Sequence, residues 1–343
     1  MLNDSWLATM VARPPLAIES AVALAREHYG LEAHAIRLSG ERDENFRLRT
    51  AQGADYLLKV AHAAEDPTVS DLLTAALEHL RASDPGLPCP RLIRPSAGAC
   101  HVRFTDGTGA ERRACVLTYL PGRPLGGASR SPRQRVACGR IAARLSNALH
   151  GFEHPAARRP LIWDARHAAA VAELLAQVPG FPDRACAAEI LGRVVPHIAS
   201  HWPRLRQQVV HNDLNPLNIL VDPADEARVT GVIDFGDMVH TALVADVAVA
   251  AAELLPEACA AGVEARVCIR EVALAYHECA PLLPQERALL GTLVAARLVT
   301  SLVVQEWHLL HNPSGGHYTA LDAAFIRARL EIAAELLCGE IEL

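Results

Sequence analysis

Two short polar segments near the middle of the chain restrict its fold more than any other feature. The first, HNDLNPLN (211–218), precedes the apolar run ILV (219–221). The second, DFGD (234–237), follows the apolar stretch 229–233. Either segment alone is weakly informative, because Asp and Asn between strands usually just form a turn. In this order, and each beside a short predicted strand, they indicate a site built from two neighbouring loops.

The spacing of these polar residues suits phosphoryl transfer. That reaction needs an oriented hydroxyl, an acceptor for its proton and oxygen ligands for a divalent cation. Asp213 and Asn218 are five residues apart and supply a carboxylate and an amide from one loop. Asp234, at the end of the next predicted strand, supplies a second hard ligand.

The chain contains a single lysine. Its 33 basic residues are 32 arginines and Lys59. A guanidinium is larger than an ammonium and planar, so arginine does not replace lysine where a compact charge is required. Lys59 lies near the end of the apolar run 56–60, which predicts a buried strand that carries a functional lysine. The alternative interpretation is that the last lysine remains at this position by chance.

Hydrophobic periodicity predicts an α+β fold in which a β-rich first third precedes a helical remainder. A helix is expected over 16–29, with Gly30 as its stop, and another over 68–81. The segment LPGRP (120–124) is the predicted boundary between an N-terminal lobe (1–119) and a C-terminal lobe (120–343). Strands are expected at 33–38, 46–49, 56–60, 100–104, 113–119, 219–221 and 229–233, and C-terminal helices at 134–149, 164–177, 187–201, 243–255, 263–277, 285–311 and 318–337.

Composition excludes several classes of protein. The net charge of −6 and the lack of a basic patch argue against nonspecific nucleic-acid binding. Nine scattered cysteines without a C-x-x-C pair indicate free thiols in a reducing compartment. The first twenty residues lack the pattern of a signal peptide, and the apolar run 243–255 is too short to span a bilayer. We therefore expect a cytoplasmic protein that binds neither membranes nor nucleic acids.

The sequence resembles the aminoglycoside phosphotransferase and choline kinase-like small-molecule kinases. The likeness is strongest to the hydroxylysine kinase branch and to kinase modules fused to aminotransferase-like phospho-lyases. It spans nearly the whole chain and implies a protein-kinase-like two-lobed fold. The matching segments are SGERDENFRL (39–48), YLLKVAHAAEDP (56–67), VLTYLPGRPL (116–125), GFEHPAARRPLIWD (151–164), HNDLNPLN (211–218) and GVIDFGDMVHTALVADVAVAAAELL (231–255).

The resemblance assigns roles to the two polar segments and to the lone lysine. Asp213 is expected to act as the catalytic base or to orient the acceptor hydroxyl. Asn218 and Asp234 are expected to hold Mg²⁺. Lys59 is expected to contact the α- and β-phosphates of ATP or GTP. His211 and Asp246 would support the catalytic loop.

The nucleotide site implied by the resemblance uses residues of the N-terminal lobe. Residues 40–45, with Gly40 and Asn45 at their ends, would close over the phosphates, although no G-x-G-x-x-G is present. The main chain of Thr118, Tyr119 and Leu120 would hold the base. Asp71 is the expected acidic partner of Lys59, with Glu78 as the alternative, since both lie on one face of the helix 68–81. A further departure is Asn212, where many relatives have Gly.

The acceptor is expected to contact the C-terminal lobe. Asp246 and Glu253 are seven residues apart on one side of a helix, and Glu253 could present an anionic face to an amine. Arg297 could grip a substrate carboxylate. Further candidates are Asp237, Trp163 and Trp307.

These expectations combine into a Mg²⁺-dependent kinase for a small hydroxylated amine or hydroxy-amino acid, such as a hydroxylysine-like or ethanolamine-like acceptor. A phospho-lyase would be a functional partner, because related modules occur fused to such enzymes. Two alternatives stay open. One is an antibiotic phosphotransferase of the aminoglycoside type, and the other is a catalytically silent module that binds nucleotide through a kinase fold.

Overall fold

The computed structural model describes residues 14–40, 42–96, 98–126, 131–312 and 319–343. These residues form two compact units that divide between Leu120 and Pro121. The predicted phosphate loop includes Glu41 and the last predicted helix begins at Tyr318, and both of these residues lie outside the described ranges.

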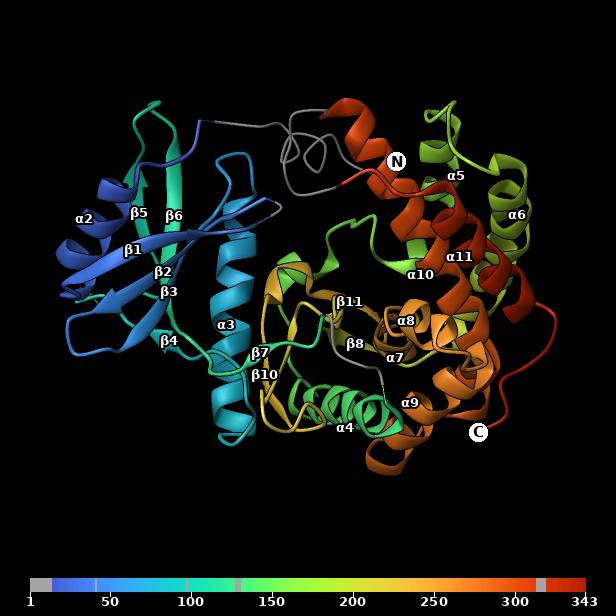
Figure 1. The fold of residues 1–343 in the computed structure, drawn as a ribbon. Coiled ribbons are helices and arrows are strands. Elements are labelled where there is room, and N and C mark those ends of the chain that lie inside the picture. Colours follow the sequence, from blue (N-terminus) through green and yellow to red (C-terminus); the bar gives the residue numbers. More distant parts are fainter. Residues whose placement is uncertain (1–13, 41, 97, 127–130, 313–318) are drawn as a thin grey trace. The chain divides into compact units, whose positions relative to one another are not determined.

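The N-terminal unit is built on an antiparallel sheet with the strand order β1-β2-β3-β6-β4, and β5 pairs with the outer part of β6. Figure 1 shows α2 and α3 on opposite sides of this sheet. The elements are α2 (Ile18–Tyr29), β1 (Ala33–Leu38), β2 (Glu44–Thr50), β3 (Asp55–Val60), α3 (Pro67–Ser83), β4 (Leu92–Ile93), β5 (Val102–Thr105) and β6 (Glu111–Thr118).

Alternation along the strands separates a core face from a polar face. Phe46 and Leu48 of β2 and Leu58 and Val60 of β3 are fully buried and pack in one cluster with the apolar side of α2. Because side chains alternate along a strand, Lys59 between Leu58 and Val60 points to the opposite face. The lone lysine therefore lies on the face of the sheet that α2 does not cover.

The C-terminal unit consists mainly of helices that pack around α7. All ten residues of α7 are buried, and α7 contacts α4, α9 and α10. The helices are α4 (Pro132–Ala148), η1 (Pro155–Arg158), η2 (Ala165–His167), α5 (Ala168–Ala176), α6 (Arg184–His201), η3 (Trp202–Arg204), η4 (Phe235–Asp237), α7 (Leu243–Ala252), α8 (Leu255–Ala260), α9 (Ala265–Cys279), α10 (Pro284–His311) and α11 (Ala323–Leu336).

Among the described helices, α10 alone is long and apolar enough to cross a membrane by length and composition. However, 83% of its most apolar window is buried inside the protein. A core helix of a globular protein has the same properties, so this helix is weak evidence for a membrane span.

Two pairs of short strands bring the polar loops of this unit to one place. The strands are β7 (Arg123–Pro124), β8 (Gln207–Val210), β9 (Ile219–Val221), β10 (Val229–Val232) and β11 (Val239–Ala242). Val210 pairs with Val239, and Ile219 pairs with Val232. The loop 211–218 and the segment 233–238 connect these pairs, so both leave the strands at the same end.

The predicted α+β class with a β-rich first part and a helical second part is confirmed. Two predicted helices are interrupted, and the prediction was wrong there. The helix expected over 243–255 divides into α7 and α8, because Pro256 lacks a backbone donor and fits only the first turn of a helix. The helix expected over 164–177 begins as η2, whose first turn is capped by the Asp164 carboxylate. The strands β4, β7, β8 and β11 were not predicted.

Candidate active site

The backbone of the loop 211–218, the expected catalytic loop, is held by a carboxylate buried in the helical core. Asp246, in the first turn of α7, is fully buried. Its Oδ1 accepts the N–H of Asn212 at 2.7 Å, and its Oδ2 accepts the N–H of His211 at 3.4 Å. Asn212 has a φ of +65°, a left-handed conformation that Asn and Gly tolerate better than other residues. Asp246 therefore fixes the turn from which Asp213 projects.

His211 supports the same loop as a neutral side chain. Its Nδ1 accepts the N–H of Asp213 at 3.2 Å, so the proton lies on Nε2, which donates to the carbonyl of Ile233 at 3.1 Å. The imidazole also packs edge-on against Phe235. Burial lowers the pKa of His211 to about 4. The geometry agrees with a supporting role for His211 and leaves it no free nitrogen for proton transfer.

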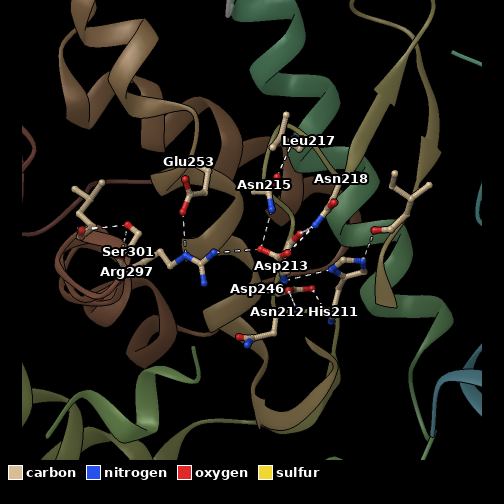
Figure 2. A network of polar contacts seen from close by, with 12 residues as sticks. His211, Asn212, Asp213, Asn215, Leu217, Asn218, Asp246, Glu253, Arg297 and Ser301 are labelled. Carbon is tan, nitrogen blue, oxygen red and sulfur yellow. Dashed lines mark hydrogen bonds and ion pairs between the residues drawn. The ribbon is translucent and has the colours of Figure 1, made fainter. Parts of the chain in front are cut away.

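Asp213 lies at the centre of a polar network (Figure 2). Its Oδ2 accepts from Asn218 Nδ2 at 2.7 Å, and its Oδ1 accepts from Asn215 Nδ2 at 2.9 Å and from Arg297 Nη2 at 3.2 Å. Burial raises the pKa of Asp213 to about 7, against the opposing effect of Arg297 and with a further contribution from Asp237. The carboxylate is thus oriented by three donors and held near the range in which it can take up a proton.

Arg297 on α10 links Asp213 to a second buried carboxylate. Its Nε donates to Glu253 Oε1 at 3.0 Å, and Arg329 Nη2 from α11 donates to Glu253 Oε2 at 3.4 Å. The guanidinium of Arg297 also lies 4.7 Å from the centre of the Trp163 ring. Burial would raise the pKa of Glu253, but the two arginines outweigh this and lower it.

This network corrects two expectations for the acceptor site. Glu253 does not present a free anionic face, because each of its oxygens accepts from an arginine. Arg297 cannot bind a substrate carboxylate through two free nitrogens, because its Nε donates to Glu253 and its Nη2 donates to Asp213. Of its three nitrogens, only Nη1 has no hydrogen-bond partner among the described residues. Sequence reasoning could not foresee this, since the charges that meet here come from α7, α10, α11 and the catalytic loop.

Asn218 and Asp234 lie on adjacent chain segments and fit a divalent cation. The N–H of Ile233 donates to the carbonyl of Asn218 at 2.9 Å, which puts Asp234 next to the end of the catalytic loop. The amide nitrogen of Asn218 is used by Asp213, and no described residue donates to its Oδ1. Asp234 has a φ of +60° and is exposed. An amide oxygen and a carboxylate are suitable ligands for Mg²⁺, which keeps its remaining positions for water and phosphate.

No group of three or more His, Cys, Asp or Glu side chains in the described part of the chain forms a metal site by itself.

Lys59 forms an ion pair with a residue that sequence reasoning did not single out. Its Nζ lies 2.7 Å from Asp43 Oδ2, and the side chains of both residues are 12% exposed. Asp43 Oδ1 also accepts the N–H of His62 at 3.1 Å. The predicted hairpin could have indicated this pair. In its register Asn45 lies opposite Lys59, and Asp43 is two residues before Asn45 on the same side of the strand.

The expectation that Asp71 pairs with Lys59 is corrected. Asp71 on α3 accepts from Arg113 at 2.8 Å and lies 3.5 Å from His101. Its side chain is 43% exposed. Glu78, the alternative, pairs with Arg81 and Arg94. Helix α3 thus directs both carboxylates to arginines, which the periodicity of the helix could not reveal.

The other residues of the expected nucleotide site have the following surroundings. A Cβ at Gly40 would lie 2.3 Å from the carbonyl oxygen of Asp43 and 2.9 Å from Asn45, so only glycine fits there. Thr118 ends β6, where its N–H donates to Arg91 O. Tyr119 and Leu120 follow Thr118, and the Tyr119 ring is partly exposed beneath the Arg47 guanidinium.

Of the remaining acceptor candidates, one lies near the catalytic loop and another does not. Asp237 is buried in η4, and its charge raises the pKa of both Asp213 and Arg297. Trp307 donates to Gln177 and stacks on His311. Because Trp307 is ten residues from Arg297 along α10, it is about 15 Å farther along the helix. The geometry replaces Trp307 with Trp163 as the aromatic residue beside the network.

Two members of the network, Asn215 and Arg329, were not among the predicted site residues. Asn215 lies inside the HNDLNPLN segment, and its Oδ1 accepts the N–H of Leu217 while its amide nitrogen orients Asp213. Arg329 had no signal, because it lies in an ordinary amphipathic helix 76 residues from Glu253.

Comparison with known proteins gives consistent matches. The family model described as the phosphotransferase enzyme family matches residues 34–282. Hydroxylysine kinase of Mus musculus is 26% identical over 93% of this chain and 89% of its own length. Homoserine kinase of Methylobacillus flagellatus is 30% identical over 73% of this chain and 72% of its own length.

Among solved structures, an amicoumacin kinase in complex with AMP-PNP and Ca²⁺ superimposes with a TM-score of 0.67. It covers 97% of this chain and 96% of its own, at 16% sequence identity. At that identity the likeness establishes the fold.

Proposed function

Because this chain belongs to the phosphotransferase enzyme family and is a small-molecule kinase, we propose that it transfers the γ-phosphoryl group of ATP to the hydroxyl of a small hydroxy-amino acid or amine. The observation that carries this proposal is the convergence of Asp213, Asn218 and Asp234 at one end of two paired strands. Those three side chains supply the groups that phosphoryl transfer requires.

In the proposed reaction Asp213 orients the acceptor hydroxyl and takes up its proton as the oxygen attacks the γ-phosphorus. The hydrogen bonds from Asn215, Asn218 and Arg297 fix the direction of the carboxylate before the acceptor arrives. Such positioning supplies much of the rate in a reaction with little covalent participation by the protein.

Oδ1 of Asn218 and the carboxylate of Asp234 would hold Mg²⁺, which neutralises the charge of the phosphate oxygens when it is bound. Lys59 would contact the α- and β-phosphates. The support for this role is that the chain retains one lysine and holds it against Asp43 in a largely buried position.

The acceptor class is supported by relatives named for their substrates. Hydroxylysine kinase and homoserine kinase each carry in their names a hydroxylated amino acid. A phospho-lyase that eliminates the phosphate from the product would be a functional partner, and the protein would act in the cytoplasm.

The proposal is tested by nucleotide consumption with Mg²⁺ and either ATP or GTP. The acceptor panel contains hydroxylysine, homoserine, threonine, ethanolamine, choline and several aminoglycosides. We expect turnover with a hydroxy-amino acid or a small amine, loss of turnover in EDTA, and a loss of about 10²–10⁴-fold in Asp213→Asn.

Each alternative has its own outcome in the same assay. Turnover with aminoglycosides alone would favour an antibiotic phosphotransferase. Binding of Mg²⁺-nucleotide with no turnover, unchanged by Asp213→Asn, would favour a silent nucleotide-binding module. Turnover that persists in EDTA would contradict the metal roles of Asn218 and Asp234.

A further inference from the structure

A pocket opens beside the catalytic loop in the C-terminal unit. It contains about 300 Å³ of space free of protein atoms, part of which is open to solvent. Val249 of α7 and Leu293 of α10 form part of its apolar lining. Its polar lining comes from Asn212, Arg297 and Thr300, and Trp163 contributes an aromatic ring. Its enclosed part has room for about one water-sized group, which suits a single polar group of a ligand rather than a whole acceptor.

Two side chains at this pocket carry polar atoms that have no hydrogen-bond partner among the described residues. Arg297 is 8% exposed and Asn212 is 1% exposed. Nη1 of Arg297 and both Oδ1 and Nδ2 of Asn212 are buried without a hydrogen-bond partner among the described residues. Figure 2 shows the Asn212 amide and the remaining guanidinium nitrogen directed to the same side of the network. Each unsatisfied buried group costs about 1–3 kcal/mol, so a ligand or water must complete them.

The hydrogen-bond donors that line the pocket favour an anionic group, and the nearby carboxylates of Asp213, Glu253 and Asp246 are already engaged by Arg297 or by a backbone N–H. The described residues that line it include no Asp or Glu. The carboxylate of Glu253, which lies next to Arg297, already accepts from two arginines. The Trp163 ring, which could otherwise face an ammonium, lies against the Arg297 guanidinium. A carboxylate finds two N–H donors here, one of them charged, and charge-assisted hydrogen bonds of this kind are strong.

We propose that this pocket binds the carboxylate of the acceptor, so that the preferred acceptor is a hydroxy-amino acid rather than an amino-alcohol. The inference rests on the proposed function. Nη1 of Arg297 and Nδ2 of Asn212 donate to the carboxylate, and Oδ1 of Asn212 accepts from the α-ammonium of the same molecule.

The geometry also brings the two polar groups of the acceptor near one another. Arg297 donates to Asp213 through Nη2 and to the carboxylate through Nη1, and both nitrogens belong to one rigid guanidinium. The acceptor's hydroxyl, which contacts Asp213, and its carboxylate are therefore held close together.

The test compares acceptors that differ only in the carboxylate. The pairs are homoserine with 3-aminopropan-1-ol, threonine with 1-aminopropan-2-ol, and hydroxylysine with 1,5-diaminopentan-2-ol. For the best pair we expect kcat/KM to be about 10–100-fold higher with the carboxylate present, the range for hydrogen bonds to a charged group.

Asn212→Gly isolates the contribution of the amide. Glycine adopts the φ of +65° and keeps the backbone N–H that Asp246 accepts, so the loop retains its support. We expect the preference for the carboxylate to fall about tenfold in this variant. Asn212→Asp, which also tolerates this conformation, places a like charge beside the carboxylate and should reduce the preference further, mainly through KM.

Binding of the same pairs without nucleotide, measured by calorimetry, separates this inference from the proposed function. Turnover with equal kcat/KM for both members of every pair would overturn the inference and leave the kinase intact. Carboxylate-dependent binding that weakens in Asn212→Gly would support the inference even if no acceptor is turned over. Equal binding of the amino acids and their decarboxylated partners, or binding of neither, would overturn it.

Discussion

Replacing Arg297 with Met should destabilise the C-terminal unit, because it leaves charges buried without a counterion. Arg297 is 8% exposed and donates to Glu253 at 3.0 Å and to Asp213 at 3.2 Å. Methionine preserves much of the apolar stem and removes the charge. Removing one partner of a buried pair costs about 3–5 kcal/mol. Arg329, which stays 3.4 Å from Glu253, offsets part of this cost.

The double variant Arg297→Met/Glu253→Gln distinguishes lost charge from lost packing. Glutamine keeps the shape of Glu253 and removes the negative charge that Arg297→Met leaves without its arginine partner. We expect the double variant to be more stable than the sum of the single effects by about 0.5–3 kcal/mol, the range for directly interacting residues.

The destabilisation of Arg297→Met should also depend on pH. The arginines hold the pKa of Glu253 below its ordinary value, and in the variant burial should raise it. Protonation of Glu253 then removes the negative charge that has lost its partner Arg297. The cost should be largest at neutral pH and above, and smaller near pH 5.

Urea unfolding followed by tryptophan fluorescence is the appropriate assay, because Trp163, Trp202 and Trp307 all belong to the C-terminal unit. A loss below about 1 kcal/mol at neutral pH, or strict additivity in the double variant, would refute the reasoning.

Three further predictions concern other parts of the molecule. Lys59→Arg should reduce turnover at least about 100-fold without unfolding the protein, because a guanidinium does not fit the place of a compact ammonium; near-normal turnover would mean that the lone lysine is accidental. Gly139→Ala should cost about 1–3 kcal/mol in urea unfolding, since its Cβ would lie 2.2 Å from the carbonyl oxygen of Val272 where α4 meets α9. Gly192→Ala is the matched control on exposed α6, where a Cβ meets nothing within 4 Å, and it should be neutral or stabilising. The pKa of His211 is about 4 in the folded protein and 6.5 in the unfolded chain, so the unfolded chain takes up the proton first. Up to about 3 kcal/mol of folding stability should therefore be lost as the pH falls from about 6.5 to about 4. The dependence of stability on pH should be shallower in His211→Asn, and an equal slope would contradict the assignment.

The sequence by itself determined the class of fold and the positions of the chemical groups. Alternation in β2 and β3 predicted the sheet, and the order of HNDLNPLN and DFGD predicted that Asp213 and Asp234 would serve one site. The prediction of the fold class was confirmed, because strand periodicity is a local property that can be read within a few residues. The shared role of Asp213 and Asp234 stays a prediction.

Only the tertiary structure decided which charges meet. Lys59 pairs with Asp43 and not with Asp71, the partner expected from the sequence. Arg297 donates to Asp213 although 84 residues separate them in the sequence. It also decided that two of the three nitrogens of Arg297 are engaged and that the third has no hydrogen-bond partner among the described residues. Partners of this kind depend on how the helices cross and on the direction of each side chain. Burial then sets their energies, because a charge enclosed by protein must find its counterion among whatever the fold brings beside it.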